Sequence, residues 1–309
     1  MRLLPDNTKL DFVGHRVIAF AIDGVLLIAT VGSLWLQGLN LGIDFTGGVV
    51  VEARHEEPID FARVRDAANG LGFGEVAIQR FGADNAVLIR VQPSARTEGQ
   101  EQVVADSIKG GLGSGFTFDR VEAVGPKVSA ELFQSGVIAT ILAVIVIAAY
   151  VAFRFEWQFG VAAFLATGHD VLMAVGLFSL FQLDFNLTSI AALLLVAGYS
   201  INDTVVIFDR IRENRRKHKK VDLGVLINLS TNQTLRRTFL TSFTTSLAVL
   251  PLLLFGGSAL FGFAAAILWG IVIGTYSSTF VASCLLLYMP PLQSGTQLAT
   301  ARSLAAGGD

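Results

Sequence analysis

The chain has 309 residues, of which 52% are hydrophobic and only 16% are charged. This composition is too apolar for a soluble globular protein of that length and indicates an integral membrane protein. The formal net charge is −2, and the single cysteine, Cys284, excludes a disulfide framework within the chain.

Six apolar stretches reach the length of roughly 20 residues that crosses the hydrocarbon core as a helix. We predict membrane spans over 17–37, 135–153, 158–181, 187–207, 237–255 and 260–288. The first stretch follows Arg2, Lys9 and Arg16, as the core of a signal peptide would. Its length and the lack of a nearby A-x-A site favour a retained anchor instead.

Residues 38–134 lie between the first two spans and are predicted to form a domain of their own. Periodicity predicts strand, helix, strand, strand, helix and strand over "GGVVVEARHE", "IDFARVRDAANGLG", "EVAIQRFG", "AVLIRVQP", "EGQEQVVADSIKGGLG" and "FTFDRVEAVGP". This βαββαβ order is the ferredoxin-like α+β pattern. The glycine-rich 110–115 lacks the Lys-Ser/Thr ending of a phosphate loop and is predicted to be a plain loop.

Ionisable residues inside the spans are informative because a charge at the bilayer centre costs roughly 2.5 to 3.5 kcal/mol on insertion scales. His169 and Asp170 lie near the centre of the third span. Neighbours on a helix point about 100° apart, so these two need not interact. Asp170 either joins a polar interior with Asp203 or fixes helix packing. Asp23, in the first span, lies close enough to the inner end to reach the interface.

Asp203 interrupts the fourth span, with Tyr199 and Ser200 one turn before it. A desolvated carboxyl that a cation can approach suits a group that gains and loses protons near neutral pH. The alternative is a structural carboxyl that accepts hydrogen bonds from the neighbouring hydroxyls.

Arg237 opens the fifth span, and Thr241, Thr244 and Thr245 follow it at helical spacing, so these groups share one polar face. The alternative is that Arg236 and Arg237 are both interfacial anchors, an interpretation that we prefer for Arg236. In the last span, the G-x-x-x-G of residues 270–274 predicts close helix packing.

Positive charges near the span ends predict the orientation. They are Arg2, Lys9, Arg16, Arg154, the Lys/Arg cluster of the basic loop 208–236, and Arg302. All fall on one side if the N-terminus, 1–16, and the C-terminal tail, 289–309, are cytoplasmic. Residues 38–134 are then periplasmic or otherwise extracytoplasmic. The cluster is interpreted as a topology signal, and no nucleic-acid partner is expected.

No Walker motif, metal-spaced His/Cys cluster or G-x-S-x-G elbow occurs in the sequence, so we predict a protein that is not an enzyme and is driven by a gradient or a partner. Several segments resemble a known family. They are "GIDFTGG" (42–48), "VGPKVSAEL" (124–132), "RFEWQF" (154–159), "GHDV" (168–171), "FNLTSIAALLLVAGYSINDTVVIFDRIREN" (185–214), "TLRRTFLTSFTT" (234–245) and "LWGIVIGTYSS" (268–278). From residue 10 to about 290 the chain resembles the SecF family, the smaller membrane subunits of the bacterial SecD–SecF protein-export complex, in the resistance-nodulation-division superfamily.

The resemblance implies a multi-pass protein of the bacterial cytoplasmic membrane. Its implied partners are SecD, which completes twelve helices, the SecYEG channel, YajC and exported unfolded polypeptides. It implies use of the proton motive force, with Na⁺ as the alternative ion, and no cofactor or metal. The implied proton pathway includes Asp203, Arg237 and Thr241, with Asp170 as a secondary candidate. Leu195 and Val196 stand where the family pattern leads us to expect a threonine before the glycine.

Two other functions remain open from the residues alone. A small-molecule efflux subunit would use similar intramembrane charges, but such transporters have much larger outer domains. A non-transporting assembly factor of the translocon would need no ionisable site. Replacing Asp203 by Asn separates both from the proton-coupled interpretation.

Overall fold

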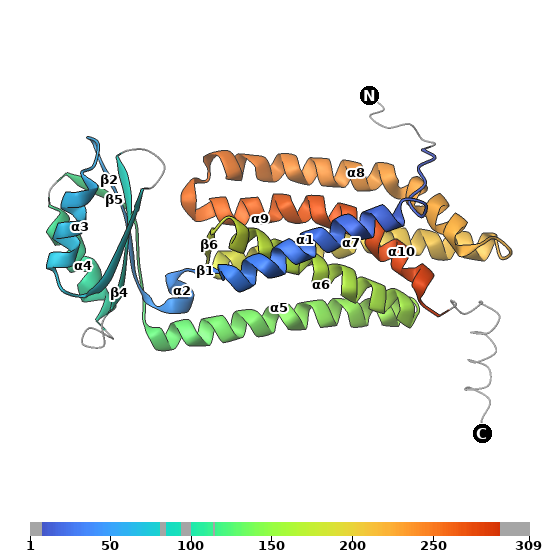
Figure 1. Ribbon diagram of the computed structural model, residues 1–309, viewed down its shortest axis with the longest axis horizontal. Helices are drawn as coiled ribbons and strands as arrows, with labels where there is room; N and C mark the ends of the chain where they lie inside the picture. Colours follow the sequence, from blue (N-terminus) through green and yellow to red (C-terminus); the bar gives the residue numbers. More distant parts are fainter. Residues whose placement is uncertain (1–7, 81–84, 94–99, 114, 291–309) are drawn as a thin grey trace, which may run out of the picture.

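The computed structural model describes residues 8–80, 85–93, 100–113 and 115–290. A bundle of long helices carries a small sheet domain at one end, and α1 begins at the opposite end (Figure 1). The long helices of the bundle are α1 (Arg16–Leu36), α5 (Pro126–Arg154), α6 (Trp157–Leu180), α7 (Leu187–Lys217), α8 (Leu223–Phe255) and α9 (Gly257–Tyr276). The last span continues through η1 (Ser277–Ala282), α10 (Ser283–Leu285) and η2 (Leu286–Tyr288).

Six helices within the described ranges are long and apolar enough to cross a membrane. This confirms the predicted class, a polytopic α-helical membrane protein. The helices extend beyond the predicted spans, most clearly α5, which begins at Pro126 rather than near residue 135. Proline is suited to this first turn, where its missing N–H has no intrahelical partner.

The prediction of a loop over 208–236 needs correction, because most of that segment is helical. α7 runs to Lys217 and α8 begins at Leu223. Leu226 and Ile227 are buried, so the extension has an apolar face to pack. The Asn214 side-chain amide also donates to Ser230 and Gln233, each at 2.9 Å, and so joins the two helices. The basic residues of this segment lie on the helical hairpin formed by the end of α7 and the start of α8.

The outer domain has the predicted βαββαβ element order. Its elements are β2 (Gly48–His55), α3 (Phe61–Gly70), β3 (Gly74–Arg80), β4 (Ala86–Pro93), α4 (Glu101–Leu112) and β5 (Phe116–Val124). The strands lie in the order β3-β4-β2-β5, and every neighbouring pair is antiparallel. Residues 110–113 end α4 and begin the connection to β5, whereas position 114 lies outside the described residues.

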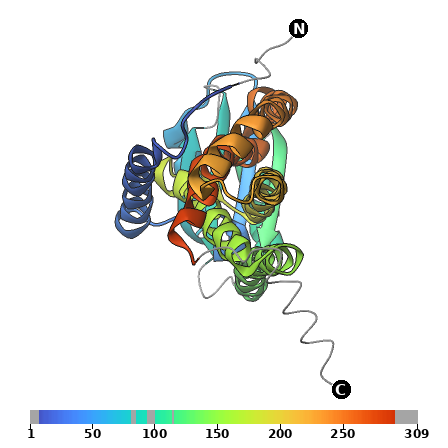
Figure 2. The ribbon, with the colours of Figure 1, turned by 90° about the vertical axis from the view of Figure 1, so that its right-hand side faces the viewer.

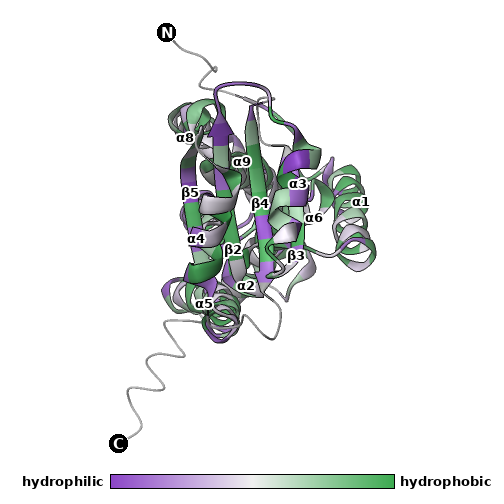
Figure 3. Ribbon diagram, turned by 90° about the vertical axis from the view of Figure 1, so that its left-hand side faces the viewer, coloured by the Kyte–Doolittle hydropathy of each residue, from purple (hydrophilic) through white to green (hydrophobic). Residues whose placement is uncertain are grey.

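One face of this sheet is covered by α3 and α4, and the other faces the helical bundle (Figure 1). Val49, Val51 and Ala53 of β2 form the core with Val104 and other apolar side chains of the two helices. Figure 3 looks onto the covered face, with the largely hydrophobic β2 behind α4. The alternation along β2 therefore buries one set of side chains under the helices.

A short second sheet attaches the outer domain to the bundle. β1 (Asn40–Leu41) follows α1 and pairs in parallel with β6 (Asp184–Phe185), which lies between α6 and α7. Arg90 of β4 places Nη2 2.5 Å from Asp184 Oδ1, and the Asn40 amide donates to the same oxygen at 2.8 Å. The short helix α2 (Ile43–Thr46) then leads into β2. Neither β1 nor β6 was predicted.

The G-x-x-x-G of the last span packs as predicted. A Cβ atom on Gly270 would overlap the side chain of Val196 on α7, and one on Gly274 would lie 3.2 Å from the Cβ of Ser200. The two glycines therefore allow α9 to approach α7 closely.

We expect Gly270→Ala to lower the free energy of unfolding by about 1 to 3 kcal/mol, because the added methyl must displace Val196. The matched control is Gly198→Ala on α7, where an added Cβ meets no atom within 4 Å. Thermal unfolding of both variants in detergent measures the difference. Equal midpoints for the two variants would contradict close α7–α9 packing.

Candidate functional site

Asp203 lies in the middle of α7 and is only 1% exposed. Thr241 and Arg237 of α8 lie near its carboxyl group, and the charge of Arg237 acts on it. The Thr241 hydroxyl itself donates to the backbone oxygens of Arg237 and Thr238. Among the described residues, no Arg237 nitrogen lies within 4.0 Å of an Asp203 oxygen. Asp203 Oδ2 has no hydrogen-bond partner. The carboxyl therefore has an oxygen that is free to take a proton.

The structure thus brings together three of the predicted site residues, Asp203, Arg237 and Thr241. The guanidinium of Arg237 is exposed and borders a cavity of about 710 Å³ between α5, α7 and α8. Thr244, predicted to share this polar face, is exposed and donates back to Leu240 O within α8. The arrangement offers a buried carboxyl beside a cation that is itself open to its surroundings.

A second polar link joins α7 and α8 one turn away. The Tyr199 hydroxyl donates to Ser242 Oγ at 2.9 Å, and Ser242 Oγ lies 2.7 Å from Thr275 Oγ1 on α9. Such interhelical bonds replace the water that the bilayer interior lacks.

Asp170, the secondary candidate, is 0% exposed and belongs to a different cluster. His169 Nδ1 lies 2.9 Å from Asp170 Oδ1, and His169 Nε2 lies 2.8 Å from Asp23 Oδ1 on α1. The prediction that His169 and Asp170 need not interact is therefore corrected, because the ring turns back toward the neighbouring carboxylate. Asp23 is also corrected: it is 7% exposed and points to His169 rather than to the interface.

The other oxygen of Asp170 accepts two hydroxyl hydrogens. Ser200 Oγ on α7 donates at 2.5 Å and Ser277 Oγ on the last span at 2.6 Å. Ser277 begins the π-helical turn η1, a feature that often marks functional positions in helices. Small hydroxyl residues follow Gly274 in the sequence, but the sequence carries no signal for the extra residue in this turn.

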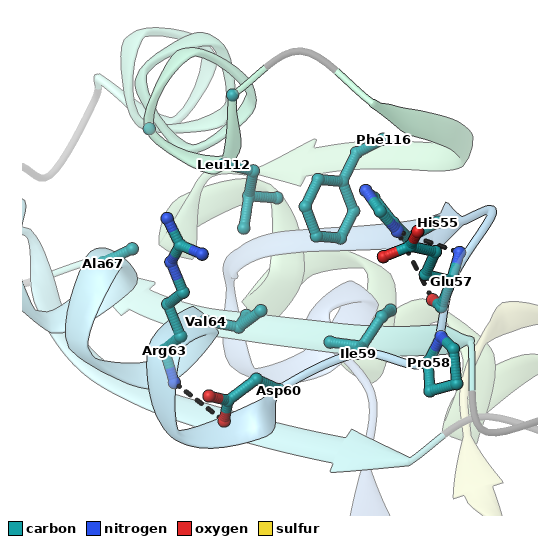
Figure 4. A pocket seen from close by; sticks show the side chains of 12 residues that line it. His55, Glu57, Pro58, Ile59, Asp60, Arg63, Val64, Ala67, Leu112 and Phe116 are labelled. Carbon is teal, nitrogen blue, oxygen red and sulfur yellow. Dashed lines mark hydrogen bonds between the residues drawn. The ribbon is translucent and has the colours of Figure 1, made fainter.

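The outer domain has a groove of about 540 Å³ at the ends of α3 and α4 (Figure 4). Asp60 accepts the Ala62 and Arg63 amide hydrogens and so caps α3, while the His55 ring packs 4.9 Å from that of Phe116. These contacts stabilise the local fold of the outer domain. No group of three His, Cys, Asp or Glu in the described ranges could hold a metal ion.

Six long apolar helices in the described ranges, with buried ionisable side chains among them and an α+β domain at one end, define a polytopic membrane protein. Residues 104–291 match the family described as protein export membrane protein SecD/SecF, C-terminal, and residues 32–57 match the SecD/SecF GG motif. The chain belongs to the SecF family of protein translocase subunits.

Two relatives are each named protein translocase subunit SecF. The one from Pseudomonas aeruginosa is 43% identical over 280 residues, covering 91% of each chain. The one from Cereibacter sphaeroides is 42% identical over 299 residues, covering 94% of this chain and 92% of the other.

Among solved structures, SecDF from Thermus thermophilus, described as a translocon-associated membrane protein, has a TM-score of 0.82 and 37% identity. The match covers 93% of this chain but 39% of that one, so this chain spans well under half of SecDF. A SecDF structure in a super-membrane-facing form has a TM-score of 0.66 and 35% identity, covering 99% and 41%.

We expect Tyr199→Phe to lower the free energy of unfolding by about 0.6 kcal/mol, and by no more than roughly 1.7, because it deletes one interhelical hydrogen bond. The control is Tyr150→Phe on α5, whose exposed hydroxyl makes no such bond between described residues. Unfolding in mixed micelles measures both values. A loss equal to that of the control would show that the α7–α8 link contributes nothing.

Proposed function

We propose that this chain is an auxiliary subunit of the Sec translocase that works with a SecD partner. The pair uses the proton motive force to complete translocation and release of secreted polypeptides at the outer face of the cytoplasmic membrane. The observation that carries the proposal is the buried Asp203 carboxyl, with one oxygen unpartnered and Arg237 and Thr241 beside it. The chain acts as a coupled transport subunit rather than as an enzyme.

Protonation changes the charge of Asp203 and so weakens its attraction to Arg237. A charge change at that position shifts the preferred arrangement of α7 and α8. One proton crossing 100 mV releases about 2.3 kcal/mol, which is enough to bias two arrangements of similar energy. The proposed ion is H⁺, because a carboxyl beside a permanently charged guanidinium can bind and release a proton without an ordered ligand shell. Na⁺ is the alternative ion.

SecD is the partner because six helices are half of the twelve in the superfamily that the sequence resembles. Large apolar side chains of α8 remain exposed along the helix, among them Phe239, Phe243 and Leu247. They suit contact with lipid or with the helices of SecD. SecYEG and YajC are the further proposed partners, and exported unfolded polypeptides are the substrate.

The orientation follows from the positive charges. The bundle end opposite the outer domain carries the positive charges (Figure 1). They are Arg16 at the start of α1, Arg154 at the end of α5 and the basic hairpin between α7 and α8. The positive-inside rule supports a cytoplasmic location for this end and for both termini. The outer domain then lies on the extracytoplasmic side, where it can bind and release the emerging chain together with SecD.

We expect Asp203→Asn to reduce export of a reporter precursor to the level seen after the proton gradient is collapsed. The amide keeps the size and polarity of the side chain but cannot exchange a proton. The measurement is the rate of precursor release in cells or vesicles that contain SecD and SecYEG.

Asp209→Asn is the matched control, because this exposed carboxyl lies on the same helix, nearly two turns later. Its export rate should equal that of the unsubstituted chain. Normal export and ion flow in Asp203→Asn would refute proton coupling at this residue. Drug sensitivity with intact export would favour the efflux alternative.

We expect Asp66→Cys, in a Cys284→Ser background, to react with a membrane-impermeant maleimide in spheroplasts whose cytoplasmic membrane is intact. Asp66 is exposed on α3, and Lys219→Cys in the basic hairpin should react only after the membrane is opened. The reverse labelling pattern would invert the proposed orientation.

A further inference from the structure

Asp23, His169 and Asp170 meet between α1 and α6, and the proposed proton pathway through Asp203 does not use them. The side chains of His169 and Asp23 are 8% and 10% exposed, and that of Asp170 is 0% exposed. Seen from the end opposite the sheet, α1 lies at the margin of the bundle (Figure 2). We call these three residues the α1 cluster.

The geometry of the α1 cluster bears on the protonation of the His169 ring. Both ring nitrogens of His169 face a carboxylate oxygen, at 2.8 Å from Asp23 and 2.9 Å from Asp170. A neutral imidazole donates from only one nitrogen, whereas the imidazolium donates from both. The contact with Asp23 is close in distance, although its angle is not that of an aligned hydrogen bond. This arrangement therefore favours the doubly protonated ring.

The charges around the α1 cluster lead to the same conclusion. Two carboxylates without a cation would place two like charges in the bundle interior, which is strongly unfavourable. α7 and η1 contribute the Ser200 and Ser277 hydroxyls, which stabilise Asp170 but carry no charge. From α9, Tyr276 directs its hydroxyl to Ala19 O at 2.6 Å, away from the ring.

Among the described residues, no Lys or Arg nitrogen lies within 4.0 Å of these carboxylates. The charge must therefore be balanced by protons held within the cluster itself.

We propose that Asp23, His169 and Asp170 form a second proton-binding site, which holds α1 against α6 when His169 carries both ring protons. Loss of one proton leaves a nitrogen lone pair facing a carboxylate oxygen, so the attraction across that contact becomes a repulsion. The role of this site in transport rests on the proposed function, but its protonation does not.

Scattered polar contacts hold α1 to the rest of the bundle, including those of Arg16 with Tyr288 and of Ala19 O with Tyr276. Thr30 Oγ1 lies 3.4 Å from Met173 Sδ, and Ser33 Oγ lies 2.8 Å from Ser179 Oγ. Beyond Leu36 the chain enters β1 and then the outer domain. A change in how α1 docks is therefore transmitted to the covalent connection of that domain.

Nitrogen NMR of the full-length chain with ¹⁵N-labelled histidine, in lipid nanodiscs, measures the protonation directly. The chain has four histidines, and His169→Gln identifies the signal of interest. At neutral pH we expect both ring nitrogens of His169 to be protonated. Asp170→Asn and Asp23→Asn should each convert the ring to a neutral tautomer, whereas His218→Gln should leave the signal unchanged.

A neutral His169 ring in the unsubstituted chain at neutral pH would overturn the proposal. So would a ring that stays doubly protonated in both carboxyl variants. Asp23→Asn, which alters the more exposed carboxyl, keeps the test decisive if Asp170→Asn fails to fold. Asp203→Asn should not change this signal, so failure of the proposed transport mechanism is distinguishable from failure of this site.

The contact between α1 and α6 is measured separately, by disulfide cross-linking. Ser33→Cys with Ser179→Cys, in a Cys284→Ser background, places two thiols where the hydroxyls now touch. At a fixed pH, His169→Gln should slow oxidative cross-linking several-fold, and His218→Gln should not. Equal rates in the His169→Gln and unsubstituted backgrounds would overturn the proposed control of α1 docking.

Discussion

The hydrogen bonds that Ser200 and Ser277 donate to the Asp170 carboxylate are the contact on which the bundle interior depends. They join α6, α7 and the last span at one oxygen atom that has no access to water. A bilayer interior offers a carboxylate no water, so neighbouring helices supply hydrogen-bond donors to this oxygen. Gly274 allows α9 and α7 to approach here, because a Cβ there would lie only 3.2 Å from the Cβ of Ser200. The small residues of the last span and the buried charge of α6 are thus parts of one packing arrangement.

α7 contributes to both ionisable clusters through residues on nearly the same side of the helix. Ser200 and Asp203 are three residues apart, which places them about 60° apart around the axis. Ser200 reaches Asp170, whereas Asp203 turns to Thr241 and Arg237 of α8. One short stretch of α7 therefore contacts both clusters through different side chains. The two clusters share a rigid element without sharing a hydrogen bond.

Much of the fold was predictable because the bilayer permits few kinds of sequence in a spanning segment. Long apolar stretches have few alternatives to spanning helices, and the outer domain alternates with the period of its strands and helices. The helical extension past Ile207 was missed because its charged residues hide a buried apolar face formed by residues such as Ile211 and Ile227. β1 and β6 were missed because two residues each are too short to show a period.

The candidate site was predictable in part for the same reason. Asp203, Thr241 and Arg237 were identified because charge inside a span has a cost and because helical spacing aligns the two α8 residues. The contact of His169 with Asp23 was not, because it depends on which face of α1 packs on α6 and on the side-chain rotamers. His169 and Asp170 are neighbours on a helix, so their Cβ atoms point about 100° apart. The imidazole side chain is long enough to turn back across that angle and reach the Asp170 carboxylate. Helical geometry constrains where Cβ atoms point better than where side chains end.

The attachment of the outer domain explains how events inside the bundle can reach it. Arg90 and Asn40 both bind Asp184, so β4, the exit of α1 and the turn between α6 and α7 meet at one carboxylate. On the other side, Ser129 at the start of α5 donates to Ile43 O of α2 at 3.1 Å. The domain is therefore held by α1, α5 and the α6–α7 turn together, and independent motion would break these bonds. A shift of α1, or of the α6–α7 turn, relative to α5 would therefore act on the outer domain through these contacts at two separate points.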